Sequence, residues 1–524
     1  MSRSDRIALF LSLIAILVSY WVTIRVFQSM AHIEDEMAYV WQAQAIARGH
    51  LTVPSPPEAK SFLVPFVVDY NGQRFGKYPL GWPIILAVGV FLGLRSWVNP
   101  LLAGLGVWLT YRLGQRVFGE AVGLLAAALT ITSPFFLMNS GSLLSHPLGL
   151  VLSAAFALAW LDAFWNDWRQ NDWREKERPR WHPWLPTLIA GLSLGVLALT
   201  RPLTAVAIGL PFGIHGIYLL FKGDTSTRWR VLTVGLISVG LGALLFVWQY
   251  AVTGDPLLNP YTLWWPYDKL GFGPDVGNTS TGHTLHLAYI NTRFSIRTGL
   301  YDLFGWSSFS WIFLPFGLLS LLPRRKFGTP FNGRGLLLAS VFVSNVLTYT
   351  IYWIGSYLFG PRYYYESLYS LTLLTAAGFA YLAGWPTRPG QPWRYFTGWW
   401  KARPLLMTAL LALLVSVNLV FYAPMRVGGM YGLYGISRER LEPFQTPEAR
   451  ALTPALIIVH PGEWTEYGAL LDLEDPFLDT PFIFVFTRGE QGDRDVAAYF
   501  PNRHIFYYYT DQPYTFYTAP RPPQ

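Results

Sequence analysis

"IALFLSLIAILVSYWVTIRVFQ" (residues 7–28) is an apolar run with a single charged side chain, Arg25. A helix of this length crosses the hydrocarbon core of a bilayer. The run is too long for the apolar region of a signal peptide, and the small residues at 29–31 make a weak cleavage site. Residues 7–28 therefore predict a first transmembrane helix.

Composition places the whole chain in the same class. Its 524 residues are 52% hydrophobic and 17% aromatic but only 13% charged, and the mean hydropathy is +0.30. Soluble proteins rarely combine so few charges with so many apolar residues. The net charge of +8 does not indicate nucleic-acid binding, because Lys and Arg collect in the cytoplasmic loops of membrane proteins. The lack of Cys excludes disulfides, thiolate metal sites and cysteine nucleophiles.

The apolar runs predict eleven membrane spans. A further run, "GWPIILAVGVFLGL" (81–94), is shorter than the roughly 17 residues that a span needs. We expect it to lie in the outer interface, or to enter the membrane and return. Besides 7–28, the predicted spans are 98–117, 120–138, 147–166, 184–200, 203–221, 231–250, 303–322, 335–355, 364–384 and 404–423.

Loop charges set the orientation. If 81–94 does not cross, nearly every short loop rich in Lys or Arg lies on the side of the N-terminus, as the positive-inside rule requires. If it crosses, the bias is reversed. The rule therefore favours the arrangement in which 81–94 does not cross. In that arrangement the N-terminus is cytoplasmic, and the long loops 29–97 and 251–302 and the C-terminus lie outside.

The C-terminal segment has a different pattern. "ALIIVH" (455–460), "FIFVFT" (482–487) and "HIFYYYT" (504–510) are typical of strands, with helical stretches between them near 463–472 and 491–500. The sequence therefore predicts an all-α polytopic membrane domain over 1–423, with amphipathic helices in its first outer loop, and a small extracytoplasmic α/β domain over 424–524.

Three consecutive acids, Glu34, Asp35 and Glu36, stand in the first outer loop, in "HIEDEMAYVWQAQAIARGHL" (32–51). One interpretation is structural, because carboxylates at a helix N-terminus offset the macrodipole and Gly49 suits the position after the helix end. The other is functional, because separate cations stand in other segments on the same outer side.

Those cations come from three places. Lys77 lies in "RFGKYPLGWP", Arg201 in "ALTRPLT", and Arg362 in "FGPRYYYE", which also holds Tyr363 and Glu366. Ionisable groups at membrane depth are costly and usually mark a site. Alternatively, Lys77 snorkels to lipid headgroups, and the arginines bind lipid phosphates or helix-end carbonyls.

Histidines give a weaker signal. His146, in "SLLSHP", is at the outer mouth of the fourth span, where a hydrogen-bonded helix end is the simpler interpretation. His283 and His286, in "GHTLH", have a spacing that suits a shared metal ion, but no nearby acid completes a ligand set. Two arginines at helical spacing, Arg293 and Arg297, follow them.

Taken together, these motifs resemble a known family. "DEMAYVWQAQAIARGHL" is similar to the acidic motif of the GT-C membrane glycosyltransferases. "KYPLGWPIILA", "LTRP" and "PRYYYE" resemble signatures of the branch of protein O-mannosyltransferases and lipid A aminoarabinose transferases. The resemblance covers roughly residues 5–385 and depends on the order of the motifs. It implies a polyprenyl-phosphate-linked sugar donor, an outward-facing site, inversion at the anomeric carbon, and no required metal or cofactor.

The resemblance also implies roles for residues. Asp35 corresponds to the catalytic carboxylate, with Glu36 beside it, and Lys77, Arg201 and Arg362 correspond to cations near the donor phosphate. Ser145 and His146 stand where many relatives have a second acid. The residues expected to hold the acceptor or support the site are Tyr39, His146, His283, His286, Arg293, Arg297, Tyr363 and Glu366.

Chemistry agrees with this assignment. A polyprenyl phosphate leaves readily when cations take up its charge, and an acceptor hydroxyl needs a carboxylate to accept its proton. The expected partners are membrane lipid, the lipid-linked sugar and a glycan, lipid or protein acceptor, in a prokaryotic cytoplasmic membrane. Two alternatives remain: a catalytically silent relative that acts as a scaffold or subunit, and a transporter of lipid-linked glycans.

Overall fold

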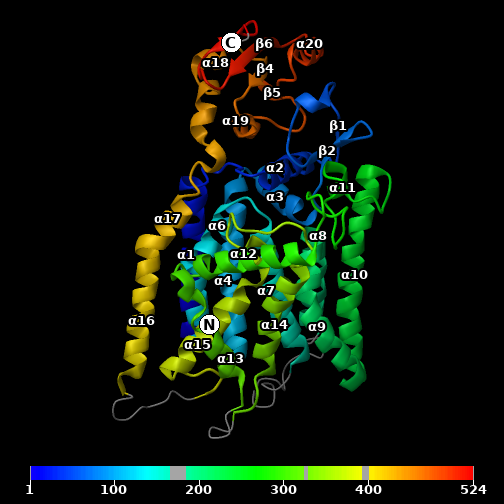
Figure 1. The fold of residues 1–524 in the computed structure, drawn as a ribbon. Coiled ribbons are helices and arrows are strands. Elements are labelled where there is room, and N and C mark those ends of the chain that lie inside the picture. Colours follow the sequence, from blue (N-terminus) through cyan, green and yellow to red (C-terminus); the bar gives the residue numbers. More distant parts are fainter. Residues whose placement is uncertain (1, 166–183, 324–328, 392–400, 523–524) are drawn as a thin grey trace.

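The computed structural model describes residues 2–165, 184–323, 329–391 and 401–522. A bundle of long helices forms the body of the molecule, and short helices and two small sheets cover one end of it (Figure 1). The helices of the bundle are α1 (Arg3–Arg25), α4 (Val98–Val117), α5 (Glu120–Thr132), α6 (Pro134–Gly141), α7 (His146–Phe164), α8 (Trp184–Thr200), α9 (Pro202–Lys222), α10 (Thr225–Thr253), α13 (Leu314–Leu321), α14 (Gly333–Tyr349), α15 (Leu368–Ala383), α16 (Arg403–Val417) and α17 (Ala423–Gly428).

Several of these helices are long and apolar enough to cross a membrane. Among the described residues five helices pass on length and composition, or up to seven if each of two bent pairs is one span. One pair is α5 with α6, bent by 63°; the other is α12 (Leu285–Asp302) with the helical segment Ser307–Leu321, bent by 96°. The predicted number of eleven spans stays a prediction, because α8, α14 and α15 are shorter than the spans that pass.

The outermost helices show which surface meets lipid. Only 11% of the most apolar part of α10 and 6% of that of the helical stretch Arg403–Phe444 is buried, against 78% for α7 at the centre of the bundle. An apolar helix with its side chains exposed needs an apolar solvent. These helices identify an integral membrane protein whose core is built around α7 and α15.

Residues 29–97, the predicted first outer loop, form a folded layer over one end of the bundle. It contains α2 (Glu34–Ala47), an antiparallel sheet in the order β1 (Val53–Pro54), β3 (Gln73–Gly76), β2 (Val67–Tyr70), and α3 (Gly81–Phe91). The run 81–94 thus contains the 11-residue helix α3, which lies beside α2 (Figure 1). Trp82 fixes α3 to the bundle, because its indole N–H donates to the carbonyl of Leu143 at 3.0 Å.

The C-terminal strands and helices are observed close to their predicted positions. They are β4 (Ala455–His460), α19 (Trp464–Leu470), β5 (Phe482–Phe486), α20 (Glu490–Ala498), β6 (His504–Tyr509) and β7 (Phe516–Tyr517). The sheet order is β5-β4-β6-β7, with β4 parallel to both β5 and β6 and with β7 antiparallel to β6. Figure 1 shows this sheet above α2, far from the N-terminus.

A seam of ion pairs joins this sheet layer to the first outer loop. Arg48, just after α2, lies 2.5 Å from Asp475 and 2.6 Å from Asp479, and Arg95 lies 2.8 Å from Asp472. Apolar residues of both parts pack together beside these pairs, including Met30 and Met37 from the first outer loop and Ile436, Leu441 and Leu470 from the C-terminal part. The helix α2, which carries Asp35, is therefore held by the C-terminal part on one side and by the bundle on the other.

Candidate active site

Asp35 lies in the first turn of α2, and two other segments reach its carboxylate. The hydroxyl of Tyr78 donates a hydrogen bond to Oδ1 at 2.7 Å, and Nη2 of Arg362 lies 3.3 Å from Oδ2. Tyr78 comes from the loop between β3 and α3, whereas Arg362 begins the 3-10 turn Arg362–Ser367 that precedes α15. Segments 43 and 327 residues away thus meet at one carboxylate.

The surrounding charges keep this carboxylate ionised. Burial acts to raise the pKa of Asp35, but Arg362, Tyr78, Lys77 and Arg201 act against it, and the pKa lies below its ordinary value. Asp35 is therefore negative at neutral pH and able to accept a proton. All three predicted phosphate-binding cations act on it, so the structure brings these four charges together.

Lys77 is enclosed by aromatic rings and one carboxylate. Its Nζ lies 3.1 Å from Oδ2 of Asp268, and the two side chains are only 3% and 1% exposed. Its Nζ lies 3.7 Å from the ring centroid of Phe66 and 4.8 and 4.9 Å from those of Tyr261 and Trp265. Burial lowers the pKa of Lys77, and Asp268 is the largest influence that opposes this shift. The rings offer their negative faces to the ammonium group.

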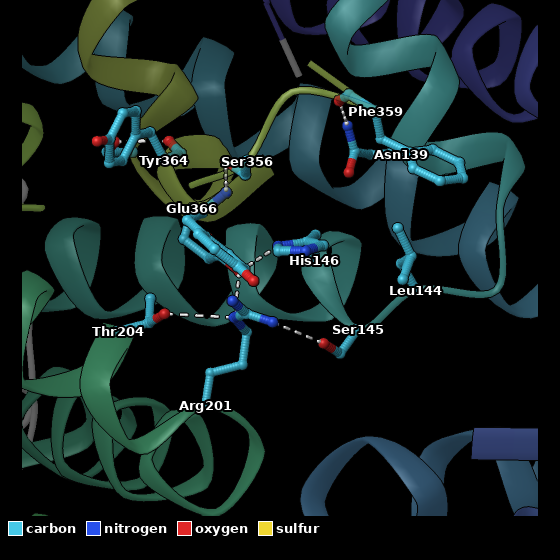
Figure 2. A network of polar contacts seen from close by, with 12 residues as sticks. Asn139, Leu144, Ser145, His146, Arg201, Thr204, Ser356, Phe359, Tyr364 and Glu366 are labelled. Atoms are coloured by element: carbon cyan, nitrogen blue, oxygen red, sulfur yellow. Dashed lines mark hydrogen bonds and ion pairs between the residues drawn. The ribbon is translucent and has the colours of Figure 1, made fainter. Parts of the chain in front are cut away.

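Arg201 and His146 share a buried carboxylate. Nε of Arg201 and Nδ1 of His146 each lie 3.0 Å from Oε1 of Glu366 (Figure 2). The other oxygen of Glu366 is buried and has no hydrogen-bond partner among the residues that the structure describes. Glu366, in the 3-10 turn before α15, thus binds side chains at the starts of α7 and α9.

Hydroxyl groups complete the surroundings of Arg201. Its guanidinium donates to Ser145 at 3.2 Å, to Tyr349 at 3.1 Å and to Thr204 at 3.3 Å. Figure 2 shows the bonds to Ser145 and Thr204. The hydroxyl of Tyr39, one turn after Asp35 in α2, lies 3.3 Å from that of Ser145. These contacts fix the plane of the guanidinium and link it to α2.

Tyr363 connects the two arginines of the cluster. The guanidinium carbons of Arg201 and Arg362 lie 5.7 and 5.6 Å from the centroid of its ring. Nη1 of Arg362 is buried and has no hydrogen-bond partner within the described ranges. A buried donor without an acceptor is costly. This nitrogen therefore marks a position where an anionic oxygen of a ligand would be stabilised.

Glu36 has different surroundings from Asp35 beside it. Its two oxygens accept backbone N–H groups of His32 at 2.8 Å and Leu143 at 2.7 Å. Burial raises the pKa of Glu36 to about 7. The structure thus places Glu36 as a link between α2 and the segment before α7, while Asp35 faces the cations.

The segment 251–302, the predicted second long outer loop, does not bring its four predicted residues into contact with Asp35. His283 is buried, with its Nε2 2.9 Å from the carbonyl of Thr350, whereas His286 is exposed on α12. Arg293 and Arg297 are exposed and line an open groove along α12 with Tyr289, Thr292, Ile296, Leu300, Tyr301 and Ser308. They form a second cationic surface, separate from the one at Asp35.

Three residues of the site escaped prediction. Tyr78 directly follows Lys77, and "WWPYDKLG" contains Asp268 within a run of aromatic residues, so both have a local signal in the sequence. Tyr349 stands at the end of an ordinary apolar helix, and nothing in its neighbourhood along the chain indicates that it binds Arg201.

Comparisons with known proteins agree with this architecture. No protein-family model matches the chain, and no curated protein matches it in sequence. ArnT from Cupriavidus metallidurans bound to undecaprenyl phosphate is similar in structure, with a TM-score of 0.55 and 13% identity, over 93% of this chain and 87% of ArnT. The chain has the GT-C fold.

Two further solved structures share this GT-C fold. The apo state of the same ArnT has a TM-score of 0.55 and 14% identity, over 94% of this chain and 88% of ArnT. The apo oligosaccharyltransferase of Archaeoglobus fulgidus has a TM-score of 0.50 and 10% identity, over 94% of this chain and 69% of that protein. At such identities the likeness concerns the fold, and the chemistry of this chain has to be argued from its own side chains.

Proposed function

We propose that this protein is a membrane glycosyltransferase that moves a sugar from a polyprenyl-phosphate donor to an acceptor hydroxyl. Asp35 accepts the hydroxyl proton as the hydroxyl oxygen attacks the anomeric carbon. The bond from that carbon to the phosphate oxygen breaks, and the polyprenyl phosphate leaves with the electron pair, so the configuration inverts. Lys77, Arg201 and Arg362 neutralise the charge that develops on the phosphate.

The convergence of one ionised carboxylate and three cations carries this proposal. Asp35 contacts Arg362 directly and lies within the electrostatic influence of Lys77 and Arg201. A base and a set of phosphate-binding cations on neighbouring segments are the groups that this displacement requires. The undecaprenyl phosphate bound to ArnT supports the choice of donor class.

The unpartnered nitrogen of Arg362 supports a place for the donor phosphate. Nη1 is buried while Nη2 bonds Asp35, so a phosphate oxygen at Nη1 would lie beside the base. Arginine binds phosphate well because its planar N–H groups match the geometry of the oxygens. Tyr363, which both arginines approach, would then form a wall of the same site.

The site and the residues 424–524 face the outside of a prokaryotic cytoplasmic membrane, where residues 424–524 form a small α/β domain. Acceptors on that side include glycans, lipids and proteins. The side chains of the site supply both the base and the positive charge, so the reaction needs no dissociable cofactor or metal.

A donor-turnover assay tests the proposal. Asp35→Asn keeps the size and the bond from Tyr78 but loses the basic oxygen, and we expect transfer to fall by at least about 100-fold. Asp69→Asn is the matched control, because Asp69 is exposed in the same segment 29–97 and its carboxylate accepts a hydrogen bond from Ser55 alone among the described residues. Unchanged transfer by Asp35→Asn would instead favour the scaffold or transporter interpretation.

A further inference from the structure

The buried pair of Lys77 and Asp268 conflicts with a simple role for Lys77 in phosphate binding. The two charges lie 3.1 Å apart and are almost fully enclosed, so each already has its counter-ion. A buried ammonium group with a carboxylate partner gains little from a second anion unless the first one leaves. Lys77, which is proposed to bind the donor phosphate, is thus already paired with Asp268 in this structure.

The two oxygens of Asp268 have different partners. Oδ1 accepts the indole N–H of Trp353 at 3.0 Å and the hydroxyl of Tyr352 at 3.4 Å. Oδ2 contacts Lys77. If Lys77 moves away, Asp268 keeps two neutral donors on its other oxygen, so the carboxylate is not left without hydrogen bonds. The pair is therefore built so that its ionic contact can be exchanged for another.

The segment that carries Asp268 is suited to such an exchange. It lies between α10 and α12 and contains one short helix, α11 (Pro260–Trp264). After Asp268 it joins the bundle by the N–H of Gly271, which donates to the carbonyl of Ile351 at 2.8 Å, and by the bridge between Leu270 and Tyr352. The ionic contact with Lys77 is thus one of several anchors near Asp268, beside the bonds that Trp353 and Tyr352 donate to Oδ1.

We propose that Asp268 is an internal competitor for the donor phosphate: its carboxylate neutralises Lys77 in the empty site and gives way to the phosphate when the donor binds. Asp268 is then a positioning residue that acts through Lys77. It keeps the ammonium group charged and in place when no donor is present. This inference rests on the proposed function, since it requires a phosphate ligand at Lys77.

A double-mutant cycle tests the competition. The measured quantity is the Kd for undecaprenyl phosphate in nanodiscs of uncharged lipid. Asp268→Asn removes the competing charge, and we expect binding to tighten about tenfold. Lys77→Met weakens binding, and in the Lys77→Met background Asp268→Asn has no further effect, because the competition acts through the lysine. Asp275→Asn, an exposed acid of the same loop, is the charge-matched control.

Each other outcome has a defined meaning. If Asp268→Asn weakens binding or leaves it unchanged, the competitor role is wrong. The same holds if its effect persists without Lys77, since Asp268 then acts only on the fold. If the unmodified protein does not bind undecaprenyl phosphate at all, the proposed function is what fails.

A second measurement covers the case in which Asp268→Asn does not fold. The chain has no Cys, so Leu270→Cys, at an exposed position two residues after Asp268, takes a single spin label. We expect undecaprenyl phosphate to increase the mobility of this label, and Lys77→Met to abolish the response. A label that is unchanged while the ligand binds would overturn the exchange of partners.

Discussion

Two regions of this molecule join acids to arginines, and they differ in burial. In the site cluster, Glu366 is fully buried against Arg201, and Asp35 lies under the outer loops against Arg362. In the seam below the C-terminal sheet, Arg48 is 47% exposed while it contacts Asp475 and Asp479. Water and salt screen the pairs of Arg48 strongly, whereas they reach Glu366 and Arg201 little. Arg95 and Asp472 of the seam, at 21% and 18% exposure, resemble Arg362 and Asp35 of the cluster, at 16% and 23%. The same residue types therefore form the proposed active site in one place and join two layers of the structure in the other.

The largest loss of stability is expected at Arg201, in the site cluster. Arg201→Ala leaves the buried carboxylate of Glu366 without its cation, at an expected cost of about 3–5 kcal/mol in stability. Thermal unfolding of the protein in nanodiscs measures this loss. Arg201→Lys keeps the charge and is expected to lose much less stability, while it loses the contacts of the planar group to Tyr349 and Ser145. Equal stability of Arg201→Ala and the unmodified protein would show that the cluster is not electrostatically shielded.

A smaller but more specific effect is expected at Arg362. Burial raises the pKa of Asp35, and Arg362 is the strongest influence that lowers it. Arg362→Gln removes that influence, so the pKa of Asp35 rises and the acidic limb of the kcat–pH profile moves to higher pH. Arg426→Gln is a matched control, because Arg426 pairs with Asp302 rather than with Asp35. An unshifted acidic limb would contradict the assignment of Asp35 as the base.

The smallest effect is expected at the seam. Arg48→Ala breaks two exposed contacts, and we expect a loss of about 0.5 kcal/mol and a transfer rate within about twofold of the unmodified protein. The difference should shrink as salt is raised, since screening already weakens these pairs. Thermal unfolding and transfer at low and high salt measure both. A large loss of transfer would mean that the C-terminal sheet orients α2 more tightly than its exposed ion pairs suggest.

The two regions also differ in how well the sequence predicted them. The helices of the bundle and the C-terminal strands follow local patterns, because apolar runs and strand periodicity are properties of neighbouring residues. Arg201, Arg362 and Asp35 were found because charged side chains are rare in such a chain. The seam was not predicted, since its acids and arginines resemble any solvated surface charges.

Sequence alone determined that the chain enters the membrane, which residues begin helix α2, and which few charges stand out against an apolar background. Those conclusions depend on hydropathy and on spacing along the chain. Only the tertiary structure decided the partners: Lys77 with Asp268 across 191 residues, and Glu366 between His146 and Arg201. A buried charge is stabilised by whichever opposite charge folding brings within a few ångströms, and that distance is not encoded in any single segment.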